Sequence, residues 1–257
     1  MCFQLCIRCI VPKDWEGKAR MKQHSQLLRM AAYTAEAVRQ YRTGLPPELP
    51  KGFRCLTQLE APGFPRMGYV AVSGPQIVIA FRGTKEAGDW KKDLLAAQLP
   101  YPYQPDKGWR THAGFTELYR LLRPGLQKAL GRAKSNRRLF ITGYSLGGAL
   151  ACLCAMDPAV RRRAASVRLY TFGAPRVGNP AFAEALSKRT ASCIRAHNDG
   201  DWVPTMPPEK FLGAEYRHGG RSFPLHNRKL TPVSSHSFQT YLEALEEWKL
   251  EDKSRPG

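Results

Sequence analysis

The feature that most constrains this chain is the stretch LFITGYSLGGALA at residues 139–151. Its first residues are apolar and β-prone and its last ones are small, so it predicts a strand that turns sharply into a helix. Ser145 stands on that turn between Gly143 and Gly147, whose missing Cβ atoms let strand and helix approach closely. A Ser on such a turn has an exposed hydroxyl and a strained backbone. We interpret Ser145 as a nucleophile; the alternative is a Gly-rich turn with a passive Ser.

A nucleophilic Ser needs a neighbouring base, usually His, which a carboxylate orients. When the nucleophile sits on a strand-to-helix turn, the acid and then the base come after it along the chain. The downstream candidates for the base are His218, His226 and His236. His236 directly precedes a long amphipathic pattern, where packing would hold its backbone, whereas the other two lie in a basic, loop-like stretch. We predict that His236 is the base.

Two carboxylates come after a short predicted strand, Asp199 and Asp201. Asp201 precedes Trp-Val-Pro at 202–204, whose bulk would remove water from the carboxylate and fix it. Asp199 precedes Gly200 and looks like a turn residue. We predict that Asp201 is the acid, with Asp199 as the alternative.

The negative charge that develops on a substrate oxygen needs hydrogen-bond donors. The backbone N–H of the residue after the nucleophile, here Leu146, is one of them. The second donor is expected in the loop after an earlier central strand, where Thr84 comes after the apolar run 77–81 and Arg-Gly. We predict that Thr84 donates through its backbone N–H, with its hydroxyl as a further candidate. The alternative is an ordinary Gly-Thr turn.

Helical and strand patterns alternate along most of the chain, which predicts an α/β fold with a mostly parallel sheet covered on both faces. Pro124 is expected to bend or divide the helix that contains it. Residues 99–105 and 205–233 are expected to be mostly loop, with some β structure in the second segment. The predicted strands cover 67–72, 76–81, 139–141, 167–172 and 191–196. The predicted helices cover 21–42, 86–97 and 114–133. Three further helices are predicted: one from the turn at Ser145 to about residue 156, one that begins near 179 and one that begins near 235.

The 257 residues and the hydrophobic content of 43% suit one large domain with a substantial core. We predict a poorly ordered extension over 1–20, a single domain over 21–252 and a tail over 253–257. Membrane spans need about 18–20 apolar residues, and the chain has no such run, so we predict no transmembrane segment. The apolar N-terminus is short and interrupted by Arg8, which makes it a poor signal peptide. This predicts a cytoplasmic protein or an export route not visible in this chain.

The chain is strongly basic, with 40 Lys and Arg against 21 Asp and Glu and a net charge of +19. Such a surface attracts anionic partners, phospholipid interfaces among them. Short Arg clusters occur at 137–138 and 161–163, without a zinc-ligand pattern or a nucleic-acid motif. We therefore predict no nucleic-acid partner, no metal and no cofactor, and interpret the clusters as solvated surface. The seven Cys residues exclude a complete set of disulfides within one chain and favour a reducing compartment.

The chain resembles the class 3 lipases, the fungal-lipase-like branch of the α/β hydrolases. The resemblance spans about residues 25–250 and keeps the order of the family's motifs. Six segments carry it: FRGT at 81–84, DWKKDL at 89–94, HAGF at 112–115, GYSLGG at 143–148, YTFGAPRVGN at 170–179 and DWVPTMPP at 201–208.

This resemblance implies an α/β-hydrolase fold, the same Ser-His-Asp triad and the same oxyanion donor as the residue-level argument. It also implies that the short helix carrying Trp90 and Leu94 is a lid over the active site. One departure is Tyr144, which stands where the family often has His before the nucleophile.

We predict a serine carboxylic-ester hydrolase that acts on lipid esters, such as triacylglycerols, through an acyl-enzyme. Phospholipase A1 and feruloyl-esterase activities are the alternatives within the same chemistry. The positive charge favours an anionic lipid and transient contact with an anionic interface. A hypothesis from a different class is a cationic binding protein that keeps the scaffold without catalysis. The presence of all three triad candidates argues against it.

Overall fold

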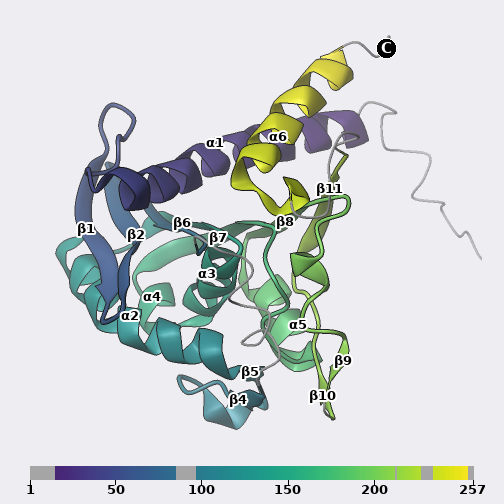
Figure 1. Ribbon diagram of the computed structural model, residues 1–257. Helices are drawn as coiled ribbons and strands as arrows, with labels where there is room; N and C mark the ends of the chain where they lie inside the picture. Colours follow the sequence, from purple (N-terminus) through teal and green to yellow (C-terminus); the bar gives the residue numbers. More distant parts are fainter. Residues whose placement is uncertain (1–14, 85–96, 212, 227–233, 254–257) are drawn as a thin grey trace, which may run out of the picture.

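The computed structural model describes residues 15–84, 97–211, 213–226 and 234–253, and its centre is a seven-stranded sheet (Figure 1). The strand order is β1-β2-β3-β6-β7-β8-β11. The first three strands pair antiparallel, and from β3 onwards every pair is parallel. The strands are β1 (Arg54–Ala61), β2 (Phe64–Ser73), β3 (Gln76–Phe81), β6 (Arg137–Tyr144), β7 (Ala164–Phe172), β8 (Ser192–Asn198) and β11 (Arg221–Leu225).

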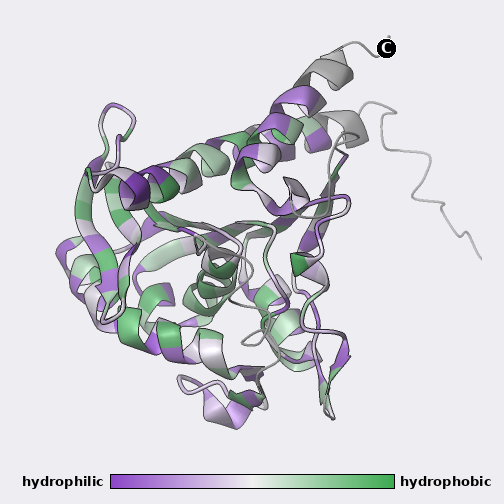
Figure 2. Ribbon diagram, in the orientation of Figure 1, coloured by the Kyte–Doolittle hydropathy of each residue, from purple (hydrophilic) through white to green (hydrophobic). Residues whose placement is uncertain are grey.

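The central strands are apolar on both faces because both faces of the sheet are covered by helices. In β3, Ile77, Ile79 and Phe81 belong to one buried cluster, whereas Val78 and Ala80, which alternate with them, belong to the other. The first cluster lies under α2 (Ala113–Arg132), α3 (Leu146–Met156) and α5 (Pro180–Arg189), and the second under α1 (Trp15–Thr43) and α6 (Phe238–Lys253). Figure 1 shows this arrangement, and Figure 2 shows the hydrophobic residues of α3 gathered at the centre. The predicted α/β class and mostly parallel sheet are confirmed.

Short elements complete the described chain. They are β4 (Gln98–Pro100), β5 (Arg110–His112), α4 (Pro158–Arg161), β9 (Lys210–Phe211), β10 (Ala214–Glu215) and three 3-10 turns, η3 (Pro105–Lys107), η4 (Val203–Thr205) and η5 (Ser234–His236). None of the helices within the described ranges combines the length and apolar character that crossing a membrane requires.

Two element predictions differ from the structure near the N-terminus. Helix α1 begins at Trp15, inside the segment predicted as an extension, and not at residue 21. Strand β1 has no counterpart among the predicted strands. Its sequence, RCLTQLEA, alternates poorly, and its pairing with β2 shifts register twice, so no clean period of two marks it. The division into an extension, one domain and a tail stays a prediction.

Pro124 does not divide α2, which is one continuous helix of 20 residues. A proline removes the hydrogen bond to the carbonyl four residues earlier, here that of Arg120. Both residues are exposed, so water can satisfy that carbonyl, and the apolar face beneath holds the helix together. The predicted division of the helix is therefore wrong, and a bend at Pro124 stays a prediction.

The remaining expectations concern segments rich in loop. The predicted short helix over 86–97 falls almost entirely in 85–96, outside the described residues. The segment 205–233 contains β9, β10 and the edge strand β11, which extends the parallel sheet beside β8. The other predicted strands and helices lie within a few residues of observed ones.

Candidate active site

The turn from β6 into α3 has the strained geometry that the sequence predicts. Ser145 lies between them with φ 54° and ψ −124°, a backbone conformation rare outside glycine. A Cβ on Gly143 would lie 2.1 Å from the carbonyl oxygen of Gly147, and a Cβ on Gly147 would lie 2.5 Å from that of Phe81. Only glycine therefore allows β3, β6 and α3 to meet this closely. The Ser145 amide donates to Phe172 O at 2.9 Å, which joins the turn to β7.

Three side chains from separate elements form one hydrogen-bonded series at the carboxyl edge of the parallel strands. Ser145 Oγ lies 2.8 Å from His236 Nε2. On the other side of the ring, His236 Nδ1 lies 2.8 Å from Asp201 Oδ2 and 3.0 Å from Oδ1. Ser145 comes after β6, Asp201 comes after β8, and His236 precedes α6. Because all three are largely buried, this arrangement can pass a proton from the hydroxyl to the ring with little competition from water.

The Asp201 carboxylate is held by more than the imidazole. Tyr241 donates its hydroxyl to Asp201 Oδ2 at 2.6 Å, and the Val203 amide donates to Oδ1 at 2.9 Å. The backbone N–H of Asn198 in turn donates to the Tyr241 hydroxyl oxygen at 3.1 Å. Burial, and then the Asp201 charge, raise the pKa of Tyr241, so its hydroxyl stays protonated and can donate. These bonds fix the position of the carboxylate that orients His236.

His236 is held through its backbone as well as its ring. The Tyr144 hydroxyl donates to the His236 carbonyl, and the two rings pack with centroids 5.1 Å apart. Burial is the main cause that raises the pKa of Tyr144, which keeps this donor protonated. Asn198 Nδ2 donates to Ser235 O at 3.0 Å, just before the histidine. Tyr144, the departure from the family's usual residue, therefore positions the candidate base.

The other candidate acid and bases lie away from this series. His226 Nδ1 contacts Asp199 Oδ2 at 2.5 Å, and both side chains are exposed. His218 is partly buried, not an exposed loop residue, and its Nε2 lies 2.7 Å from Pro204 O. Burial lowers the pKa of His218 to about 3, so its ring is neutral. Neither histidine is bonded to Ser145 in the described residues.

One candidate oxyanion donor, Leu146, and the residue before the other, Gly83, adjoin the nucleophile. Leu146 is the first residue of α3, so its N–H is among the donors that a helix leaves without an internal acceptor. A Cβ on Gly83 would lie 3.1 Å from Ser145 Cβ, which places the residue before Thr84 against the turn. Arg82 donates to the carbonyls of Gly83, Arg66 and Pro65 at 2.6, 2.9 and 2.9 Å and so anchors this loop. Trp90 and Leu94, the predicted lid residues, lie outside the described residues.

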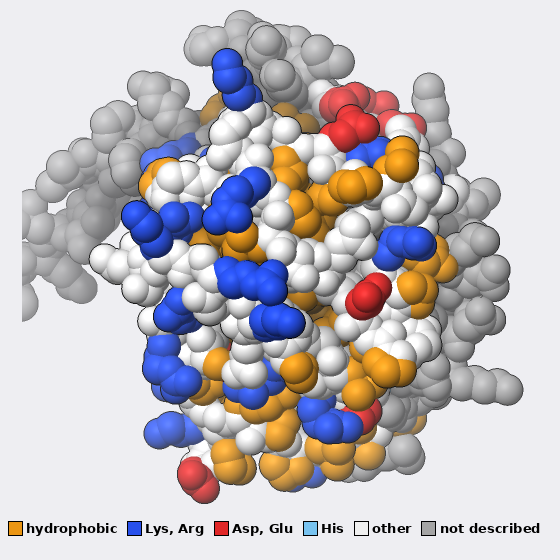
Figure 3. All heavy atoms as spheres, turned by 90° about the vertical axis from the view of Figure 1, so that its left-hand side faces the viewer, with side chains coloured by type: hydrophobic (Ala, Val, Ile, Leu, Met, Phe, Trp, Pro, Cys, Tyr) orange, Lys and Arg blue, Asp and Glu red, His pale blue; other side chains and the backbone are white. Residues whose placement is uncertain are grey.

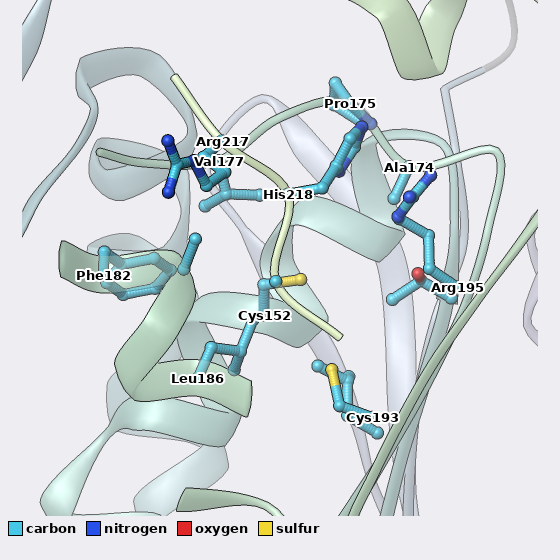
Figure 4. Close-up of a pocket in the computed structure, with 14 residues that line it drawn as sticks. Cys152, Ala174, Pro175, Val177, Phe182, Leu186, Cys193, Arg195, Arg217 and His218 are labelled. Atoms are coloured by element: carbon cyan, nitrogen blue, oxygen red, sulfur yellow. The ribbon is translucent and has the colours of Figure 1, made fainter. Parts of the chain in front are cut away.

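A small pocket lies elsewhere, between α3, α5, β7 and β8 (Figure 4), and no member of the triad lines it. Its thiols belong to Cys152 and Cys193, which point into it (Figure 4). Burial raises the pKa of Cys193 to about 11 and that of Cys152 further above its ordinary value. Because thiols with a raised pKa are poor nucleophiles, the pocket supplies no rival to Ser145.

Sequence reasoning missed the supporting roles of Tyr144 and Tyr241. In the sequence, Tyr241 is one more member of the apolar face of the last helix. The signal in the sequence was a hydroxyl group on a helix face expected to be buried. A buried Tyr hydroxyl usually has a hydrogen-bond partner, so this residue could have been assigned a polar role. Residues 202–204 were expected to fix the Asp201 carboxylate by their bulk, and the Val203 backbone amide helps to fix it through a hydrogen bond to Oδ1.

The sequence of this chain is similar to those of known lipases. The family model described as lipase (class 3) matches residues 78–211, just over half of the chain. A lipase of Rhizomucor miehei is 36% identical over 57% of this chain and 41% of its own length. Phospholipase A1-II 3 of Oryza sativa subsp. japonica is 30% identical over 70% of this chain and 53% of its own. The chain thus spans about half the length, or less, of these curated relatives.

Solved structures agree on the architecture. A lipase from Rhizopus microsporus var. chinensis superposes with a TM-score of 0.63 at 25% identity and covers 82% of this chain and 76% of its own. A triacylglycerol lipase described as having a serine protease triad at its catalytic centre has a TM-score of 0.63 at 26% identity, over 80% of each chain. The predicted α/β-hydrolase fold is confirmed.

Proposed function

The chain belongs to the class 3 lipase family, and on that premise we propose that it hydrolyses carboxylic esters of lipids through a serine acyl-enzyme. The observation that carries the proposal is the continuous series of hydrogen bonds from Ser145 Oγ through His236 to Asp201, with Ser145 itself on a strained turn. Ser145 is the nucleophile, His236 the base and Asp201 the acid that orients it.

In the first half of the reaction, Ser145 Oγ attacks the ester carbonyl while its proton passes to His236 Nε2. The resulting imidazolium is stabilised by Asp201 on its other nitrogen. The N–H of Leu146 and the donors of Thr84 stabilise the negative charge on the former carbonyl oxygen. The intermediate then collapses, the C–O bond to the alcohol breaks, and His236 gives its proton to the departing alcohol oxygen.

In the second half, a water molecule takes the place of the alcohol. His236 accepts a proton from this water, which attacks the acyl carbon on Ser145. Collapse of the second tetrahedral intermediate returns the proton to Ser145 Oγ and releases the carboxylic acid. Every proton transfer passes through His236, which already contacts Ser145 and Asp201, and no step needs a metal or cofactor.

The substrate class rests on the relatives and on charge. The relatives named lipases support an acylglycerol as the substrate of this chain, whereas the rice relative named phospholipase A1-II 3 supports a phospholipid. A feruloyl-type ester remains an alternative for the same triad. The net charge of +19 favours substrates presented at an anionic interface.

A substrate panel tests the proposed function. We expect p-nitrophenyl esters from acetyl to stearoyl to be hydrolysed, together with triolein or phosphatidylglycerol, and feruloyl esters to be poor substrates. Activity on feruloyl esters alone would transfer the proposal to that class. An intact, folded chain that hydrolyses no ester would support the cationic binding protein instead.

Thr84 is expected to contribute through its hydroxyl as well as its backbone. Thr84→Val keeps the shape and the backbone N–H but removes the hydroxyl, so kcat on a soluble ester should fall about 10²-fold with KM little changed, the size typical of one lost oxyanion donor. Thr43→Ala is the control, because this exposed hydroxyl bonds, within the described residues, nearby backbone groups alone, Arg39 O and the Leu45 amide. A kcat equal to that of the control would restrict the role of Thr84 to its N–H.

The lid is proposed from the sequence alone. If the apolar face led by Trp90 and Leu94 covers the site and swings into a lipid interface, Trp90→Ser should lower activity on emulsified long-chain esters more than on soluble short-chain ones. The measurement is the ratio of the two rates. Equal losses together with a lowered melting temperature would assign Trp90 to the core instead.

A further inference from the structure

The positive charge of this chain is concentrated in one part of the sequence. Residues 118–183 contain 12 Lys and Arg and a single carboxylate, Asp157, for a net charge of +11 out of +19. Asp157 is buried and bonded to Arg123 at 2.6 and 3.1 Å, and it also accepts from the Tyr119 hydroxyl at 2.9 Å. It is therefore not available to neutralise the surface.

The fold brings the two Arg clusters of this region together at the amino edge of the parallel strands. The first cluster opens β6, and the second begins at Arg161, the last residue of α4, and runs to the start of β7. Arg137 pairs with Ala164 across the two strands, and the Asn136 amide donates to Arg163 O at 3.0 Å. Helix α2 ends beside them. Figure 3 views the left-hand side of Figure 1, where α2 ends, and Lys and Arg outnumber Asp and Glu on it.

Some of these cations hold the fold and others face outward. Arg163 Nη2 donates to the carbonyls of Leu130 and Ala133 at 3.0 and 2.9 Å, which satisfies the end of α2. Arg137 Nη1 donates to Ser73 O at 2.9 Å. Exposed side chains flank these anchored ones, and in the described part of the chain none of them forms an ion pair with a carboxylate. We call them the amino-edge cluster: Arg132, Lys134, Arg138 and Arg162.

We propose that the amino-edge cluster binds an acidic polysaccharide. The triad lies at the carboxyl edge of the same sheet, so a polymer held at the amino edge leaves the active site open. A bilayer is a poorer fit to this cluster, because docking there would point the triad away from the lipid, so the contact with an anionic interface proposed for catalysis would use other cations of the chain. Nucleic acid is also a poorer fit. The cluster includes no aromatic side chain on which a base could stack, and helix and strand ends, not the length of a helix, face outward.

Binding of this kind depends on counterion release, so affinity falls steeply with salt, and each cation that contacts the polymer adds nearly one to the slope of log K against log salt. The planar guanidinium of Arg138 and Arg162 also suits two-point bonding to a sulfate or carboxylate. The inference goes beyond the proposed function and requires no catalysis.

The test uses heparin fragments as the probe and compares two triple variants of the full chain. Lys134→Gln, Arg138→Gln and Arg162→Gln together remove three charges from the cluster. The matched control combines Lys22→Gln, Lys107→Gln and Lys210→Gln, three exposed residues on α1, η3 and β9. Binding is measured by fluorescence anisotropy at several salt concentrations, and hydrolysis of p-nitrophenyl acetate checks that each variant keeps its activity.

We expect the cluster variant to bind heparin between tenfold and a hundredfold more weakly than wild type at about 0.15 M salt, with a slope lower by about two to three. The control should stay within about threefold of wild type. Equal losses in the two variants would show that only net charge matters and would overturn the proposal. So would tighter binding of a DNA duplex or of phosphatidylglycerol vesicles than of heparin, each with the same dependence on the cluster. Because binding is measured without substrate, its failure is distinct from a failure of ester hydrolysis.

Discussion

Ser145→Ala is expected to reduce kcat on p-nitrophenyl butyrate by four to six orders of magnitude, the range that loss of a serine nucleophile produces in triad enzymes. The variant removes one oxygen, which lies 2.8 Å from His236 Nε2 and is the atom that carries the acyl group in the proposed mechanism. Alanine is preferred to glycine because it faces the same strain at φ 54° as serine, so the turn should be perturbed least.

The control for this experiment is Ser135→Ala, an exposed serine in the turn before β6. Both variants should keep the wild-type circular dichroism spectrum and melt within a few degrees of it. Trapping adds a second measurement, since a fluorophosphonate ester should label the wild type and the control but not Ser145→Ala. Labelling of Ser145→Ala, or turnover near the wild-type rate, would assign the nucleophile to another residue.

Patterns within one segment were enough to predict the turn around Ser145. The change from a β-prone run to small residues spans 13 positions, and the glycines needed for close approach stand inside it. The buried strand β3 was equally legible, because an uninterrupted apolar run fits a strand covered on both faces. In both places local sequence and tertiary environment favour the same structure, which is the condition for reliable prediction.

Interactions between distant segments were not legible in the same way. Tyr241 and Asp201 are 40 residues apart, and nothing local to either residue specifies the 2.6 Å bond between them. The joining of the Arg clusters at 137–138 and 161–163 likewise depends on β6 and β7 being neighbours in the sheet. Strand β1 failed for another reason: its register shifts erase the alternation on which strand prediction depends.

An amphipathic helix pattern follows His236 directly and does not follow His226, which favoured His236 as the base. The second large prediction tests this choice. His236→Ala is expected to lower kcat by four to six orders of magnitude, because Ser145 loses the group that accepts its proton. His226→Ala should change kcat by less than about twofold, since the His226 ring is exposed and bonded to Asp199, not to the triad. The measurement is kcat and KM for both variants on one soluble ester at fixed pH.

Loss of the His236 ring leaves a space between Ser145 Oγ and the Asp201 carboxylate, and the bonds from Tyr241 and Val203 still hold that carboxylate in place. Added imidazole should enter this space and accept the Ser145 proton, so it should restore part of the activity of His236→Ala and none of the activity of Ser145→Ala. This rescue separates a chemical role from a structural one, because a collapsed site would not respond to imidazole. A larger loss of kcat in His226→Ala than in His236→Ala would assign the base to His226 and contradict the roles given to both residues.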